Sequence, residues 1–215
     1  MQKKSSLPEI KNNIPEFLGI IISIAGLVVM AGWFFNIGLL KSILPVWASM
    51  KFSTALAFVL SGTILYFGVR WRKQNQQLAS IFLPIIGMLI LLLMLSLLAS
   101  TVIGISLGVE EFFVKDSIAA VGSVTPGRPS VATMINFTFI AIYGFFICFE
   151  WNKIFKIEII LSILVGLTGL VAVFGYIFNQ PLWYFQVSGR SSAMALHTAI
   201  LFVLWSIGAV LTIKK

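Results

Sequence analysis

The sequence has little charge and few of the side chains that most catalytic and metal sites require. Only 10% of its 215 residues are charged and 59% are hydrophobic, whereas soluble domains carry about 25% charged residues. The single cysteine, Cys148, and the single histidine, His197, exclude an internal disulfide, a cysteine-rich metal site and a bis-histidine haem site. No phosphate-loop, zinc-protease or Ser/His/Asp pattern is present. We therefore predict a protein that is not an enzyme and holds no cofactor or metal.

What the sequence does contain is a series of long apolar runs that are nearly free of charge. Runs of about 18 or more such residues are typical of membrane-spanning helices, which satisfy their own backbone hydrogen bonds in lipid. We therefore predict an all-α integral membrane protein with six transmembrane helices, forming a single membrane domain over residues 1–215. The runs cover residues 17–35, 53–69, 80–105, 131–149, 159–178 and 193–213.

The basic residues are placed unevenly around these runs. Ten of the fifteen lysines and arginines lie at the chain ends or in the links after the second and fourth runs. Because cytoplasmic loops are rich in basic residues, this predicts cytoplasmic termini and three outer connections. The bilayer is then the main partner. We predict no nucleic-acid binding, because the basic residues flank apolar runs and form no patch among aromatic residues.

A short motif opens the second, fourth and sixth runs. It reads Thr-x-aliphatic-x-Phe and begins at Thr54, Thr133 and Thr198, with spacings of 79 and 65 residues. A second echo links the first and fifth runs, which end in Gly32-Trp-Phe-Phe-Asn36 and Gly175-Tyr-Ile-Phe-Asn179. These repeats predict three helical hairpins, at about residues 15–69, 80–149 and 159–213.

The motif also predicts a one-sided stripe on each helix that it opens. Side chains four residues apart share a helix face. Met50, Thr54 and Phe58 therefore line up, and Met194, Thr198 and Phe202 do the same. Pro129 replaces the methionine before Thr133, which makes the middle hairpin the divergent copy. Close helix packing is expected at small residues, namely Gly166 and Gly169, or Ala57 and Ser61.

The segment Pro126-Gly-Arg-Pro-Ser-Val-Ala-Thr133 resembles the end of an outer loop in a family of bacterial membrane modules. The segments at residues 50–58 and 194–202 are similar to it. The family comprises the N-terminal multi-helix sensor modules of sensor histidine kinases and diguanylate cyclases. Its members typically have an Arg and a Met before the Thr; here Arg128 matches and Pro129 does not. The resemblance implies a membrane sensor with a cytoplasmic kinase or cyclase domain or protein as its partner, and it implies no particular ligand.

Seven residues are candidates for ligand binding, and each has a simpler structural role as its alternative. The motif threonines could form a polar layer between converging helices, although we favour that each bonds back to its own helix or bridges tightly packed helices. The buried amide of Asn136 needs a partner, which a ligand or a neighbouring helix could supply. The candidates are Thr54, Thr133, Asn136, His197, Thr198, Arg128 and Arg190.

The charged candidates near the outer ends of the runs have similar alternatives. His197 could respond to pH or contact a ligand, and we favour a simple hydrogen bond at the membrane interface. Arg128, Arg190 and Lys51 each precede a motif threonine, where they could face an anion or, as we favour, extend to lipid headgroups. The acids Glu110, Glu111 and Asp116 are expected in a solvated loop, and Glu158 at the opposite interface.

Together these features predict a non-enzymatic membrane sensor or signal-input module that responds to an outer-side or membrane-borne stimulus. A small transporter or channel component is the main alternative, since many carriers are built from repeats. A structural subunit of a membrane complex is a third. The oligomeric state is open and includes a homodimer.

Overall fold

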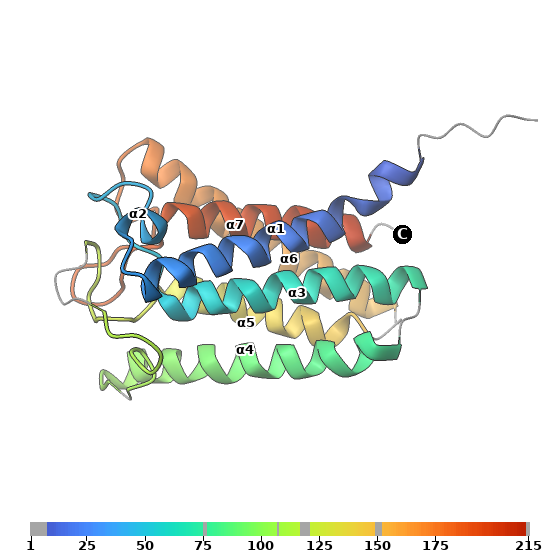
Figure 1. Ribbon diagram of the computed structural model, residues 1–215, viewed down its shortest axis with the longest axis horizontal. Coiled ribbons are helices and arrows are strands. Elements are labelled where there is room, and N and C mark those ends of the chain that lie inside the picture. Colours follow the sequence, from blue (N-terminus) through green and yellow to red (C-terminus); the bar gives the residue numbers. More distant parts are fainter. Residues whose placement is uncertain (1–7, 75–76, 107, 117–120, 149–151, 214–215) are drawn as a thin grey trace, which may run out of the picture.

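The computed structural model describes residues 8–74, 77–106, 108–116, 121–148 and 152–213. These ranges contain seven helices and the connections between them. Six of them are long and run along the long axis of an elongated bundle (Figure 1). The helices are α1 (Pro8–Phe34), α2 (Gly38–Lys41), α3 (Phe52–Gln74), α4 (Gln77–Ile103), α5 (Val131–Phe146), α6 (Asn152–Ile177) and α7 (Leu196–Ile213).

The helices have the length and composition of a membrane protein. Four of them, α1, α3, α4 and α6, are long and apolar enough to cross a bilayer, and α5 and α7 are shorter apolar helices. The fourth predicted run extended to residue 149, but α5 ends at Phe146 and residue 149 lies outside the described residues. The prediction of an all-α membrane protein is therefore confirmed, whereas the finer prediction of six transmembrane helices stays a prediction.

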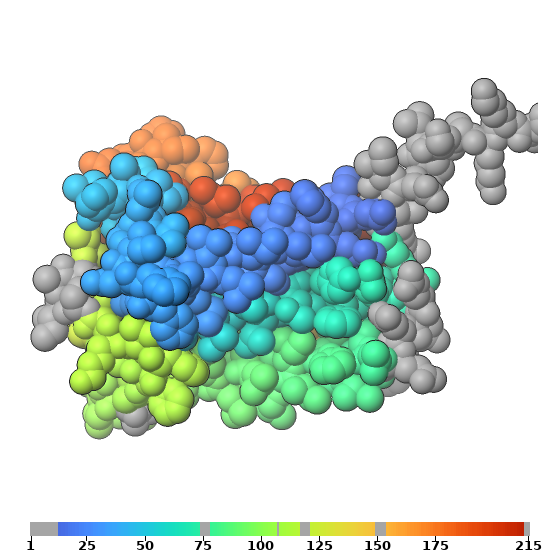
Figure 2. Space-filling view, viewed as in Figure 1, coloured from blue at the N-terminus to red at the C-terminus, as the bar shows by residue number. Residues whose placement is uncertain are grey.

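The long helices pair as neighbours along the chain, as the repeat predicts. The closest pairs are α1 with α3, α4 with α5, and α6 with α7. The second member of each pair lies towards the centre, since α3 also packs against both α5 and α7. The spanning window of α3 is 67% buried, against 33% for α1, α4 and α6. In the space-filling view, α7 shows only as a strip between α1 and the orange segment that includes the end of α6 (Figure 2).

The two ends of the bundle differ. The three long connections between paired helices gather, in their described parts, at one end, here called the loop end (Figure 1); these parts are residues 35–51, which include α2, and residues 104–106, 108–116, 121–130 and 178–195. The opposite end, called the terminal end, is where α1 begins and α7 ends. At this end α3 continues to Gln74 and α4 begins at Gln77, so both helices extend beyond the predicted runs 53–69 and 80–105.

The three motif phenylalanines meet in the middle of the bundle. Phe58, Phe137 and Phe202 are each fully buried. Their ring centroids lie 4.8 Å apart for the first pair and 5.0 Å apart for the other two, mostly in edge-to-face arrangements. The methionines and threonines above them are also buried, namely Met50, Thr54, Thr133, Met194 and Thr198. The predicted stripes therefore converge on one aromatic layer.

In each hairpin the two helices approach each other closely at the same position relative to the motif. The residue eight positions after the motif threonine is small in all three copies, and a glycine of the outer helix faces it. The pairs are Gly62 with Gly19, Ala141 with Gly87, and Ser206 with Gly166. A Cβ added to Gly62 would lie 2.4 Å from the Gly19 carbonyl oxygen, closer than real Cβ contacts allow. Close approach of Gly166 and Gly169 to α7 was predicted and is confirmed.

We expect Gly62→Ala to lower the thermal midpoint of the detergent-solubilised protein by roughly 2–10 °C, because overpacking must push α1 away from α3. The matched control is Gly38→Ala in α2, where an added Cβ would meet no atom within 4 Å. Heating followed by size-exclusion chromatography measures both midpoints. Equal midpoints for the two variants would show that the close approach is not required.

Candidate binding site at the loop end

The two helices that share the Gly-x-x-x-Asn echo end in the same backbone turn. Asn36 and Asn179 both adopt left-handed conformations, with φ of 54° and 52°. In each turn the next residue donates its N–H to the echo glycine, from Ile37 to the Gly32 carbonyl and from Gln180 to the Gly175 carbonyl, both at 2.8 Å. This is the bonding of a Schellman cap, in which asparagine tolerates the left-handed position better than most residues.

The aromatic residue that follows each echo glycine ties the hairpin together. Trp33 Nε1 donates to the Met50 carbonyl at 2.9 Å. The Tyr176 hydroxyl donates to the Met194 carbonyl at 2.8 Å. The motif methionines therefore matter through their backbone as well as their side chains. The sequence had marked both partners, one in the echo and one in the stripe, but not the bond between them.

The divergent middle hairpin uses an ion pair at this end. An Arg128 Nη2 atom lies 2.6 Å from Glu110 Oε1 and also donates to Ser100 Oγ at 2.6 Å. The Glu110 side chain is 1% exposed. Burial raises the pKa of this carboxyl, but hydrogen bonds from Ser100 and Arg128 outweigh burial and lower the pKa to about 2.

A second ion pair joins the first hairpin to the connection of the middle one. Lys51 Nζ lies 2.6 Å from Asp116 Oδ2, and the two side chains are 5% and 3% exposed. Lys51 also donates to Ser123 Oγ at 2.5 Å, and the Gly127 N–H donates to Asp116 at 3.0 Å. The α3 helix is thus fixed to a loop far away in sequence.

These pairs correct the expected roles of four charged residues. Arg128 and Lys51 were expected to extend to lipid headgroups, and Glu110 and Asp116 to lie in a solvated loop. Instead the long middle connection folds back over the helix ends and buries opposite charges together. Charged groups removed from water need such partners, so the loop and the pairs form together. Arg190 alone of the three bases remains exposed.

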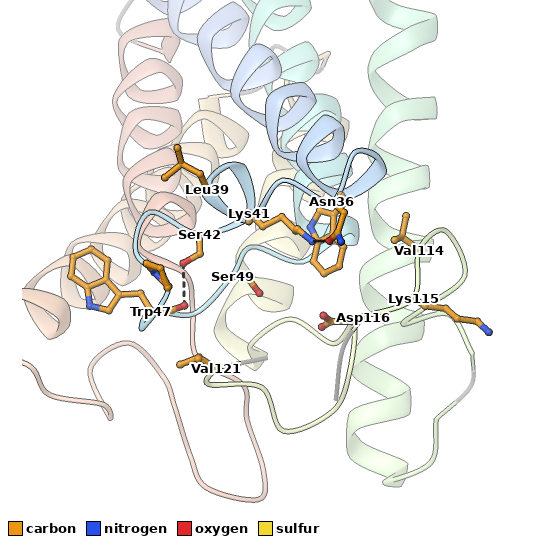
Figure 3. Close-up of a pocket in the computed structure, with 13 residues that line it drawn as sticks. Asn36, Leu39, Lys41, Ser42, Trp47, Ser49, Val114, Lys115, Asp116 and Val121 are labelled. Carbon is orange, nitrogen blue, oxygen red and sulfur yellow. Dashed lines mark hydrogen bonds between the residues drawn. The ribbon is translucent and has the colours of Figure 1, made fainter. Parts of the chain in front are cut away.

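A cavity of about 700 Å³ lies between α2 and the middle connection (Figure 3). Lys41 Nζ donates to Asn36 Oδ1 at 2.7 Å and sits 4.7 Å from the centre of the Trp33 ring. Asp116 lies on the opposite wall, with Ser49 between the two, whereas Lys115 points away. The cavity therefore offers polar groups of both signs, but none of the seven predicted ligand residues lines it.

The motif threonines are buried at the starts of the central helices, and Thr133 takes part in a helix cap there. The Ser130 hydroxyl caps α5 by accepting from the Thr133 N–H, and the two hydroxyls are 2.7 Å apart. Thr133 therefore bonds within its own helix and its cap, which is the role that we favoured over ligand binding. Thr54 and Thr198 are each 2% exposed, which leaves them no surface to offer a ligand.

His197 lines a smaller apolar cavity of about 310 Å³, beside Val29 of α1 and Leu40 of α2. Both of its ring nitrogens are buried, and neither has a hydrogen-bond partner among the described residues. The prediction that His197 makes a hydrogen bond at the membrane interface is therefore wrong as far as the described residues are concerned. The α1 and α2 helices cover the imidazole with apolar side chains, which could not be foreseen from the sequence around it.

Two of the seven predicted residues do share a cavity. Asn136 and Arg190 both line a cavity of about 620 Å³ between α5, α6 and the third long connection. Asn136 Nδ2 donates to Thr168 Oγ1 at 2.6 Å. The sequence did not predict that these two residues lie close together, because 54 positions separate them.

The terminal end has a buried ion pair of its own, besides a half-buried pair of Lys73 with Glu16 at 2.8 Å. Arg72 of α3 pairs with Glu158 of α6, and its Nη1 atom also donates to the Thr212 carbonyl of α7 at 3.4 Å. The Glu158 side chain is fully buried. The sequence predicted Glu158 at the interface but not that its side chain is buried, because α3 covers it and supplies the opposite charge.

Within the described ranges, no group of three or more His, Cys, Asp or Glu residues is placed to hold a metal ion. Comparison of the chain with protein-family models, with curated proteins and with solved structures finds no match. The resemblance to bacterial sensor modules therefore stays a prediction.

The pKa of Glu110 predicts a pH-dependent contribution to stability. Since the folded pKa of about 2 lies below the ordinary 4.5, the ionised carboxyl stabilises the fold fully above pH of about 4.5 and loses this effect towards pH 2. We expect Glu110→Gln to lower the thermal midpoint by several degrees at pH 7, and the gap to wild type to narrow between pH 5 and pH 3. Glu111→Gln is the control. A gap that does not change with pH would contradict this role.

The hydrogen bonds from Trp33 and Tyr176 to the methionine carbonyls, here called the aromatic ties, predict two similar losses of stability. Trp33→Phe and Tyr176→Phe should each destabilise the protein by about 1 kcal/mol, because each leaves a methionine carbonyl without its donor. The two effects should add in the double variant, since the ties lie in separate hairpins. Tyr66→Phe on α3 serves as the control, and urea unfolding in mild detergent measures all four. Losses no larger than that of the control would show that the ties are dispensable.

Proposed function

We propose that this chain is a non-enzymatic, membrane-embedded sensor or signal-input module. In this proposal all six long helices cross a bacterial or archaeal inner membrane, the loop end faces outward and both termini are cytoplasmic. A stimulus at the loop end or in the outer leaflet changes the packing of the central helices. The change then reaches a cytoplasmic kinase or cyclase domain or protein through α7.

The distribution of charge supports this orientation. Basic residues at both ends pair with acids, including Arg72 with Glu158 and Lys73 with Glu16 at the close of α3. The asymmetry lies in their number, because the sequence places ten of its fifteen basic residues at the chain ends or in the links on the terminal side of the apolar runs. Excess basic charge on one side of the apolar region is typical of the cytoplasmic face. With 18 residues, α7 would be about 27 Å long, close to the hydrocarbon thickness of about 30 Å.

The observation that carries the proposal is the contact of Phe58, Phe137 and Phe202 across three helices. Packed interiors have little free volume, so a displaced helix must carry its neighbours or repack against them. A shift at the loop end of one hairpin would therefore reach the other two. A ligand transmits through such a layer only if it binds two packing arrangements with different affinity.

A path from this layer to the terminal end is available. Arg72 contacts α6 at Glu158 and α7 at the Thr212 carbonyl. Movement of α7 along its axis would change this contact first. The terminal end of α7 is thus the place where packing changes become accessible to a cytoplasmic partner.

A transporter is the competing function, and the same layer counts against it. Carriers place their substrate sites near the bilayer midplane between repeats. Here the central axis is closed by three fully buried phenylalanines, and the polar cavities described above lie towards the loop end. Solute flux across liposomes that contain the purified chain would favour the carrier, and co-purification in a stable membrane complex would favour a structural subunit.

The coupling itself can be tested with spin labels at Ile81 of α4 and Ile207 of α7, both exposed, in a Cys148→Ser background in lipid nanodiscs. We expect Asp116→Asn, which weakens the Lys51 ion pair at the loop end, to shift the distance between the labels by about 1–2 Å. Lys115→Gln, at the neighbouring position, should leave it unchanged. Identical distances in both variants would contradict transmission along the bundle.

A further inference from the structure

The cavity between α5 and α6 has features that the packing of the bundle does not use. Its volume is about 620 Å³, within the range of ordinary ligand sites. It is separate from the cavity of Figure 3 and shares no lining residue with it. Its walls come from α5, α6 and the connection before α7, and most of the lining is apolar.

Asn136 supplies an unsatisfied acceptor in this cavity. Its side chain is fully buried, and its Nδ2 atom donates to Thr168 Oγ1 at 2.6 Å. The Thr168 hydroxyl in turn donates to the Val165 carbonyl at 2.9 Å, so it can only accept from Asn136. This fixes the orientation of the amide and leaves Oδ1 as an acceptor. No partner for Oδ1 is found in the described parts of the chain.

Arg190 supplies an unpaired cation to the lining of the same cavity. Among the described residues its guanidinium has no hydrogen-bond or ion-pair partner, and the residue is exposed. A tight turn carries it: Val187 and Ser191 bond to each other in both directions, at 3.1 and 2.9 Å. Gly189 takes the left-handed conformation that this turn requires, with φ of 70°. The cation is therefore held by ordered backbone.

The remaining wall faces the side of the bundle. Ile135 of α5 and Leu164 of α6 line the cavity and are each 39% exposed. In a membrane this side would meet acyl chains, so an occupant can enter sideways from the bilayer. It must combine an apolar chain with a hydrogen-bond donor for Asn136 and a negative charge for Arg190.

We propose that this cavity binds an acyl amphiphile with an anionic head and a hydroxyl group, or an amide N–H, close to that head. The anion lies beside Arg190, the donor bonds to Asn136 Oδ1, and the chain covers Ile135 and Leu164. The proposed binding goes beyond the sensor function, because the ligand would bind whether or not the protein transmits a signal. An acyl chain without the donor leaves the buried oxygen unpaired.

The test uses the purified full chain in nanodiscs of zwitterionic lipid, with 3-hydroxytetradecanoic acid and tetradecanoic acid as probes in isothermal titration calorimetry. We expect the hydroxy acid to bind at one site per chain and about 5- to 100-fold more tightly than the plain acid. Its methyl ester, which lacks the negative charge, should bind more weakly. Equal affinity of the wild-type protein for the two acids would overturn the proposal without any variant.

Three variants locate the site. Asn136→Leu, which removes an unpaired buried group, should stay folded and lose the preference for the hydroxy acid. Arg190→Gln should weaken both acids by a similar factor of about 3 to 10, as expected for one exposed charge. Lys115→Gln, another exposed base at the loop end, should change neither affinity. A preference that survives Asn136→Leu would place the binding elsewhere and overturn the assignment.

Discussion

The arrangement of the bundle depends on the packing of three aromatic rings at its centre. Phe58, Phe137 and Phe202 can touch only if α3, α5 and α7 lie side by side, with the first helix of each hairpin outside. Aromatic rings at these distances attract each other beyond the effect of burial alone. The small residues at the hairpin contacts make this geometry possible, because they let each outer helix lie flat against its central partner.

Charge then fixes the ends that the aromatic layer leaves free. Buried ion pairs tie Lys51 to Asp116 and Arg128 to Glu110 at the loop end, and Arg72 to Glu158 at the terminal end. The Lys51 and Arg72 pairs join segments 65 and 86 positions apart, whereas Arg128 and Glu110 lie 18 positions apart within the middle connection. Breaking one partner would leave the other charge buried, so these contacts lock the register of the hairpins more firmly than surface pairs would. A change in any of them is therefore a means of changing helix packing.

His197 and Asn136 are two of the buried side chains that have an atom without a hydrogen-bond partner among the described residues, and they bear on function differently. His197 sits in an apolar cavity with no unpaired charge beside it, so nothing there indicates a ligand. Asn136 shares its cavity with the unpaired Arg190, which gives a ligand two points of recognition. The position of this cavity beside Phe137, one residue further along α5, would link an occupant directly to the aromatic layer. Binding and signalling could thus share one helix.

The sequence by itself determined the helical class, the three hairpins and the two Met-Thr-Phe stripes, because each depends on apolar runs and residue spacing along the chain. It marked the Gly-x-x-x-Asn echo without predicting the asparagine caps. Only the tertiary structure decided which charges pair, that Glu158 is buried, and that Asn136 meets Arg190. The outcomes at the loop end depend on how the long connections fold over the helix ends, and the burial of Glu158 depends on how α3 and α6 come together at the terminal end. The partners lie 18 to 86 positions apart. Local spacing specifies a helix face, but a buried charge finds its partner only when separate helices have packed.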